Sequence, residues 1–169
     1  METISLNSCD HPVSRLLAAR ILEDAELIGE LLALAPREWD TWQPDWPAGD
    51  AGDPPFSMAQ LAAHLAESLG GVCACLHRLY PVQLAHFAGL REPAAEYPKL
   101  VLAAREGFAL LTDADLARPL PTVFSPEGAP FLETLLINWK HLLLHGHQLF
   151  LYLKLAGVPV STRHLYRFR

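Results

Sequence analysis

Two histidines four residues apart, His141 and His145, form the first pattern in this sequence that could do chemistry. On a helix, both imidazoles would lie on one face with Cβ atoms roughly 6 Å apart, so that one metal ion can bind both rings. The spacing alone is weak support, because eight histidines in 169 residues give about 0.4 such pairs by chance. A metal site therefore needs a further ligand from elsewhere in the chain.

His64 supplies a third imidazole on a second predicted helix. Ser57 and Gln60 fit a capping box, which marks the start of a helix. Its apolar face carries Leu61, Leu65, Leu69, Val72, Leu76 and Leu79. His64 lies beside Leu65 on the helical wheel, so we expect its ring to point toward the bundle interior. The last predicted helix presents one stripe that is unusually polar for a core face: Leu135, Asn138, His141, His145, Gln148 and Tyr152.

These residues, in this order, resemble the DinB/YfiT-like family. A lone His after a capped amphipathic segment is followed much later by His-x-x-x-His, by Gln three positions on, and by Tyr-Leu-x-Leu-x-Gly. The resemblance covers nearly the whole chain, including the segment 111–118 before the last helix. It implies a four-helix bundle in which His64, His141 and His145 hold a divalent metal. Gly146-His147 and Phe56 depart from the Arg-Gly and Trp that are common in the family.

Composition and charge fit one compact domain over residues 1–169, an all-α four-helix bundle of the DinB/YfiT-like type with long loops between helices. The chain is 51% hydrophobic and 19% charged, and its length suffices to bury a sizeable core. A formal net charge of -6 with few lysines provides no basic stripe for phosphate contacts, so nucleic acid is not an expected partner.

Neither a membrane span nor a disulfide framework is expected. No stretch reaches roughly 18 uninterrupted apolar residues, and no N-terminal segment combines a basic start with an apolar run. The three cysteines are an odd number, which fits reduced thiols and a cytoplasmic protein. Cys73 and Cys75 point to different faces of their helix and are expected to be buried packing residues.

Four helices must position the histidines. The apolar spacing and the proline and glycine positions predict helices from Pro12 to about Ala35, from Met58 to Tyr80, from Pro98 rather than Pro93 to about Leu111, and from Pro130 to Gly157. Leu16 and Leu17 are both counted in the apolar spacing of the first helix. The segment 118–129 is rich in Pro and Gly, which predicts irregular structure or a short hairpin.

The connection from Pro36 to Phe56 holds three tryptophans, Trp39, Trp42 and Trp46. Loops of this length usually have a function or are disordered, and three large aromatic residues argue against disorder. They either plug the end of the bundle or line a pocket for substrate. His64 lies roughly 9 Å down its helix from Met58, so this loop leaves the bundle near the expected metal.

Three neutral imidazoles would leave the charge of a divalent ion uncompensated and at least one coordination position open, as in catalytic zinc sites. Water or a thiol bound there loses its proton readily. Two enzyme classes remain open: transfer of a thiol to a small electrophile, and metal-dependent hydrolysis. The resemblance favours the first, because characterised relatives include low-molecular-weight thiol transferases and a thiol-dependent isomerase. No residue is assigned a catalytic role.

The alternative without catalysis is a metal-binding or stress-response protein in which the ion ties two helices together. Its fourth ligand would be Glu67, Glu23 or Asp24. Around the ligands, Asn138 and Gln148 could orient an imidazole by accepting its second N–H, whereas His147 is expected on the surface. Zinc or nickel is the expected metal, and a small thiol is the expected second cofactor. The resemblance also implies a homodimer.

Overall fold

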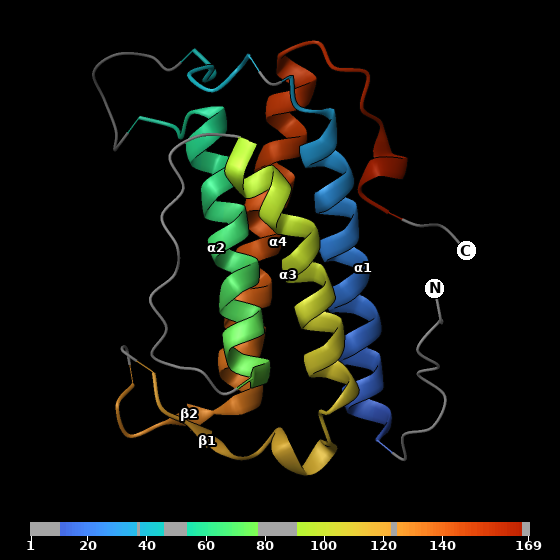
Figure 1. The fold of residues 1–169 in the computed structure, drawn as a ribbon, viewed down its shortest axis with the longest axis vertical. Helices are drawn as coiled ribbons and strands as arrows, with labels where there is room; N and C mark the ends of the chain where they lie inside the picture. Colours follow the sequence, from blue (N-terminus) through green and yellow to red (C-terminus); the bar gives the residue numbers. More distant parts are fainter. Residues whose placement is uncertain (1–10, 37, 46–53, 78–90, 123–124, 167–169) are drawn as a thin grey trace.

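The computed structural model describes residues 11–36, 38–45, 54–77, 91–122 and 125–166. Within this part of the chain, four long α-helices form an all-α bundle: α1 (Pro12–Leu34), α2 (Met58–His77), α3 (Arg91–Ala109) and α4 (Phe131–Leu155) (Figure 1). Short 3-10 helices, η2 (Asp113–Asp115) and η3 (Thr162–His164), precede and follow α4. The predicted fold class is therefore confirmed.

The first, second and fourth helices begin where the sequence signals predict. Pro12 opens α1, and Ser57 and Gln60 form the expected capping box before α2: Ser57 N donates to Gln60 Oε1 at 2.8 Å, and Gln60 N donates to Ser57 Oγ at 3.3 Å. Gly157, with a φ of +83°, follows α4 in the left-handed conformation that glycine adopts without steric cost. The predicted end of the second helix at Tyr80 lies outside the described residues.

The predicted start of the third helix at Pro98 is wrong, because α3 begins at Arg91 and continues through that proline. A proline inside a helix removes one backbone hydrogen bond and usually disfavours the turn before it. Here Tyr97, directly before the proline, is 1% exposed and packs over Gly29 of α1. Burial of this aromatic ring outweighs the local preference against the first turns of α3.

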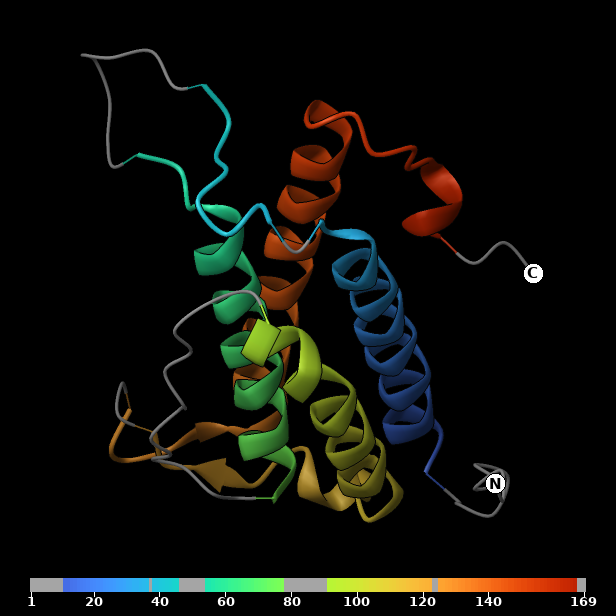
Figure 2. The ribbon, with the colours of Figure 1, turned by 45° about the horizontal axis from the view of Figure 1, so that its top comes forward.

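A short antiparallel hairpin leads into α4, as the Pro- and Gly-rich composition allowed. Strand β1 (Pro119–Leu120) pairs with β2 (Ala129–Pro130), and Figure 2 shows the hairpin beside the end of the bundle at which α2 finishes. Asp113 of η2 reaches across to α1 and accepts a hydrogen bond from Ser14 N at 2.9 Å. This carboxylate caps α1 from a distant part of the chain.

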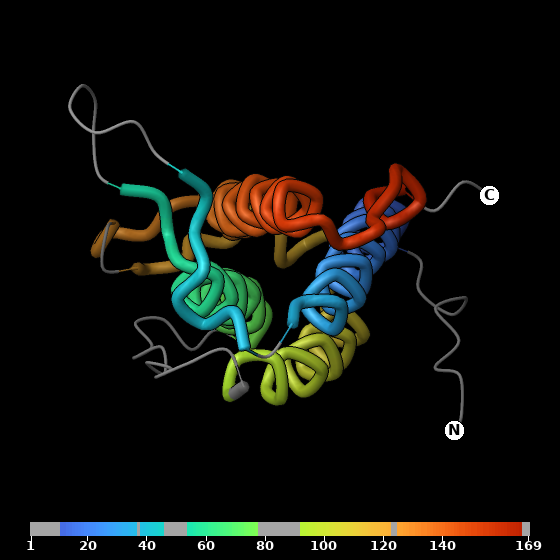
Figure 3. Tube along the Cα trace, turned by 90° about the horizontal axis from the view of Figure 1, so that it is seen from above, coloured from blue at the N-terminus to red at the C-terminus, as the bar shows by residue number. Residues whose placement is uncertain are grey.

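Seen along the bundle, α2 lies beside α3 and α4, and α1 occupies the opposite corner (Figure 3). α2 is apolar enough to cross a membrane by length and composition, with a mean hydropathy of 1.2. However, 67% of that stretch is buried inside the bundle, as expected for a core helix. Leu16 of α1 is 60% exposed, so its place in the predicted apolar spacing is wrong, whereas Leu17 is buried as that spacing predicts.

Candidate metal centre

Three imidazoles from two neighbouring helices meet at one place. His64 extends from α2, and His141 and His145 extend from α4. One nitrogen from each ring lies within 4.8 Å of the other two. The ring centroids are 4.8 Å apart for His64 and His141, 4.4 Å for His64 and His145, and 4.7 Å for His141 and His145. In the described part of the chain, no other set of three His, Cys, Asp or Glu side chains converges in this way.

The hydrogen bonds indicate which ring nitrogens face the centre. His145 Nδ1 lies 2.9 Å from Gln148 Oε1, and His64 Nδ1 lies 3.4 Å from Glu67 Oε2. Because these oxygens accept hydrogen bonds, each Nδ1 carries the hydrogen and each Nε2 keeps its lone pair. His141 Nε2 and His64 Nε2 are 2.8 Å apart. One nitrogen of each ring therefore faces a common point.

The Nε2 atoms of His64 and His141 are close to the separation that a shared metal ion requires. Zinc–imidazole bonds of about 2.0–2.1 Å in tetrahedral geometry place ligand nitrogens about 3.3 Å apart. The Nε2 atoms of His64 and His141, now 2.8 Å apart, would separate by about half an ångström. Side-chain rotation alone can supply this, since both rings are only partly buried or exposed.

The site also favours the neutral imidazoles that metals require. Partial burial lowers the pKa of His141 below its ordinary value, and the neighbouring His145 and His64 lower it further. Burial likewise lowers the pKa of His145, with His64 adding to the effect, although the hydrogen bond to Gln148 opposes it. Because His141 and His145 resist protonation, their lone pairs stay available for a cation.

Aromatic side chains border the cluster on the loop side. The Phe56 ring lies 5.2 Å from that of His64 and 5.9 Å from that of His145. In the sequence, Phe56 is only a departure from a residue that is common in the family, and its contact with the histidines follows from the tertiary structure. It gives the cluster an apolar wall.

The tryptophan loop packs at the same end of the bundle. Trp39 and Trp42 are partly buried against the core and stack with ring centroids 5.9 Å apart. Trp42 meets the ring of Tyr152 edge-on at 5.5 Å, and its carbonyl accepts a hydrogen bond from Met58 N at 2.8 Å. Their packing fits the plug interpretation, and Tyr152 connects the plug to the helix that carries two histidines. Trp46 lies outside the described residues.

Of the predicted neighbours of the ligands, Gln148 and Glu67 contact histidine rings as described above. Asn138 has a different role: its amide nitrogen donates to Thr134 O at 2.9 Å and contacts Cys75 Sγ at 3.6 Å, which ties α4 to α2. His147 is exposed, as expected, with Nδ1 2.8 Å from Leu143 O.

The other two proposed fourth ligands lie apart from the cluster. Glu23 pairs with Arg20 at 3.2 Å, and Asp24 accepts a hydrogen bond from Trp139 Nε1 at 2.9 Å. Cys73 and Cys75 are buried, and burial raises the pKa of the Cys73 thiol to about 12. Neither acid closes the coordination shell, and Cys73 is not a reactive thiolate.

By sequence, no family model and no curated protein matches this chain. By structure, the chain is similar to a DinB-like protein, YjoA, from Bacillus subtilis, whose crystal structure superposes with a TM-score of 0.67. The alignment covers 90% of this chain and 99% of that chain at 16% sequence identity. Such a likeness speaks for the fold, which agrees with the resemblance seen in the sequence. The chain thus has the fold of a DinB-like four-helix bundle.

Proposed function

We propose that this protein binds one divalent metal ion through His64, His141 and His145 and uses it to activate a small anionic ligand. The observation that carries the proposal is the convergence of three imidazole nitrogens within 4.8 Å of one another. Among the described residues, no carboxylate or thiol adds a ligand atom to this group, and Glu67 contacts the outer nitrogen, Nδ1, of His64. A dication held there keeps its full charge and an open coordination position, as in catalytic rather than structural zinc sites.

The reaction we propose is transfer of a small-molecule thiol to a small electrophile. A bound divalent ion supplies Lewis acidity that lowers the pKa of a coordinated thiol or water. The described cysteines, Cys73 and Cys75, are not suited to supply the sulfur: both are buried, and Cys73 Sγ donates to Leu100 O at 3.3 Å. We therefore propose that the sulfur comes from a separate small molecule. Phe56 offers an apolar wall against which the carbon skeleton of a substrate can pack.

Zinc or nickel is the metal we expect, since imidazole suits both and the availability of metals in the cell decides between them. We place the protein in the cytoplasm, where a reduced small thiol would be abundant. Two alternative functions would replace thiol transfer if it is not found. One is hydrolysis by a metal-activated water, and the other is metal binding without catalysis.

The first prediction concerns metal content. Purified protein should hold about one divalent ion per chain, and His64→Ala or His145→Ala should lose most of it because two imidazoles seldom retain such an ion. Inductively coupled plasma mass spectrometry of dialysed protein gives the stoichiometry. His147→Ala is the matched control, since this exposed ring lies outside the cluster and contacts Leu143 O of its own helix, and it should keep the metal. Full occupancy in both ligand variants would show that the histidines are not the ligands.

A second prediction concerns pH. Because the folded-state pKa of His141 and His145 is lowered, the rings stay neutral above the reference histidine pKa of about 6.5, and metal lowers their proton affinity further. Stabilisation by metal should therefore be complete near pH 8 and fade as the pH falls from about 6.5 toward 5. The difference in Tm between holo and apo protein measures this. A difference that stays constant over the range would argue for other ligands.

The third prediction tests the thiol. In cobalt-substituted protein, adding a small thiol should produce an intense near-ultraviolet sulfur-to-cobalt band, because an uncompensated dication favours a soft anion. The Cys73→Ser/Cys75→Ser variant should show the same band, which assigns it to the added thiol. A spectrum unchanged by several thiols, combined with hydrolysis of a carboxylate or phosphate ester, would establish the hydrolase instead. If the protein shows neither the sulfur-to-cobalt band nor ester hydrolysis, it binds metal without catalysing either reaction.

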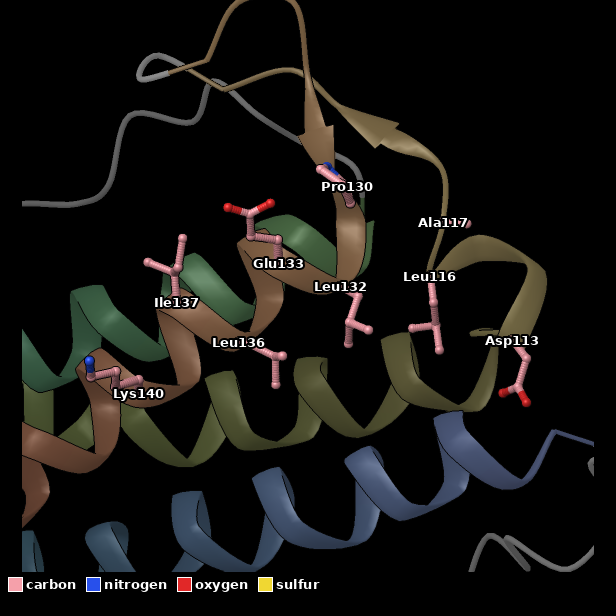
Figure 4. A pocket seen from close by; sticks show the side chains of 9 residues that line it. All are labelled: Asp113, Leu116, Ala117, Pro130, Leu132, Glu133, Leu136, Ile137 and Lys140. Carbon is pink, nitrogen blue, oxygen red and sulfur yellow. The ribbon is translucent and has the colours of Figure 1, made fainter.

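We also propose that a second copy of the chain packs on α4. Four large apolar residues lie on one exposed stripe of this helix: Ile137, Leu144, Leu151 and Leu155, each between 55% and 70% exposed. Near its N-terminal end, Leu116, Leu132 and Leu136 help to line an apolar hollow of about 620 Å³, with Lys140 at its border (Figure 4). A continuous stripe of this kind is typical of an interface, whereas single exposed leucines are not.

A homodimer around a twofold axis would use this stripe on both copies. The fourth prediction is that the wild-type protein has a dimer mass at high micromolar concentration, and that Leu144→Glu is a monomer because the change buries an unpaired charge at the contact. Light scattering coupled to size exclusion measures both. Leu102→Glu, at a residue 54% exposed on α3, is the control and should remain dimeric. A monomer mass for the wild-type protein would contradict the proposed homodimer.

A further inference from the structure

A continuous chain of contacts runs from the histidine cluster to the tryptophan loop. Gln148 Oε1 accepts a hydrogen bond from His145 Nδ1 at 2.9 Å, and Gln148 Nε2 donates to the Tyr152 hydroxyl at 3.0 Å. The Tyr152 ring then meets Trp42 edge-on, with ring centroids 5.5 Å apart. His145, Gln148 and Tyr152 follow one another at single-turn spacing on α4, so backbone geometry alone aligns the polar part of this chain.

The orientation of the Gln148 amide decides whether His145 can bind a cation. With Oε1 toward the ring, Nδ1 carries the hydrogen and Nε2 presents a lone pair to the cluster. With the amide reversed, its N–H would face Nδ1, and the neutral ring would carry its hydrogen on Nε2, toward the other two imidazoles. A group that holds the amide in the first orientation therefore holds His145 in the tautomer that a metal requires.

Tyr152 is placed to hold that orientation. Its side chain is almost fully buried, with the residue 5% exposed, and its oxygen is the acceptor for the amide nitrogen of Gln148. Without that oxygen, a partly buried amide N–H would lose its hydrogen-bond partner, which favours another amide position. The hydroxyl thus acts on His145 through Gln148 rather than by touching the cluster.

Trp42 in turn limits where the Tyr152 ring can lie. It contacts the ring edge-on, stacks on Trp39, and is fixed at its own backbone by the hydrogen bond from Met58 N at the first residue of α2. The same helix carries His64. Both Trp42 and His64 are therefore attached to the first turns of α2. A shift of Trp42 would be passed to His145 through Tyr152 and Gln148.

We propose that Tyr152 is a positioning residue for the metal centre: it orients Gln148 so that His145 offers Nε2, and through its contact with Trp42 it couples the tryptophan loop to metal affinity. This inference rests on the proposed metal binding. By reciprocity, a molecule that displaces Trp42 alters metal affinity, and metal binding alters the environment of Trp42.

The test compares zinc affinity, measured by competition with a chromogenic chelator, in wild type and variants. Tyr152→Phe should weaken zinc binding about tenfold, the lower end of the range for residues that orient a ligand. Tyr97→Phe is a matched control, because it also removes a buried tyrosine hydroxyl but one without a hydrogen-bond partner in the described structure; its affinity should equal that of wild type.

Rescue separates positioning from packing. Gln148→Glu introduced into Tyr152→Phe should restore affinity, because either carboxylate oxygen accepts from Nδ1 and none can donate to it. Zinc should also change the tryptophan emission of the wild type, and this change should be lost in Trp42→Phe. Wild-type affinity in Tyr152→Phe would overturn the inference while leaving the metal site intact. A loss that Gln148→Glu does not restore would assign Tyr152 to packing, and a wild type that binds no zinc would remove the metal site itself.

Discussion

The packing of α2 against both α3 and α4 is the constraint on which the rest of the structure depends. Its apolar face is completely buried, and each leucine that leaves water there contributes about 1.5–3 kcal/mol. Leu61, Leu65 and Leu69 are 0% exposed, so α2 can neither rotate nor slide without uncovering them. Rotation is also limited by the contact between Cys75 Sγ and the Asn138 amide of α4. The position of His64 relative to α4 is therefore set by the core.

Helix α4 has three faces with different roles. One side carries core leucines, including Leu135, Leu142 and Leu149, and the next carries the two histidines and Gln148. The exposed apolar stripe through Leu144 lies about 60° around the helix from His141, at about 100° per residue. A partner on this stripe would border the histidine cluster. The proposed dimer and the proposed metal centre are thus adjacent because a single helix carries both.

Close approach of α1 to α4 completes the framework. A Cβ at Gly146 would lie 2.6 Å from Ile28 Cδ1, so a larger residue would displace Ile28 or push α1 away. Glycine at this position, between His145 and the exposed His147, lets α4 lie against α1 on one side while it presents His145 on another. The polar stripe then stays at the edge of the core, where partial burial lowers the pKa of His141 and His145 and solvent still reaches the cluster.

Local features of this protein could be predicted from sequence because their causes are local. Pro12, the Ser57–Gln60 capping box and Gly157 mark helix ends through backbone geometry, and the spacing of His141 and His145 puts both rings on one face of any helix. Tertiary structure decided what depends on distant partners. Burial of Tyr97 carries α3 through Pro98, and Leu16 faces solvent although its spacing suits the core. Phe56 meets the histidines, and Tyr152 joins Gln148 to Trp42, only because the α2–α4 contact and the loop before α2 bring them together; no spacing along the chain encodes those distances.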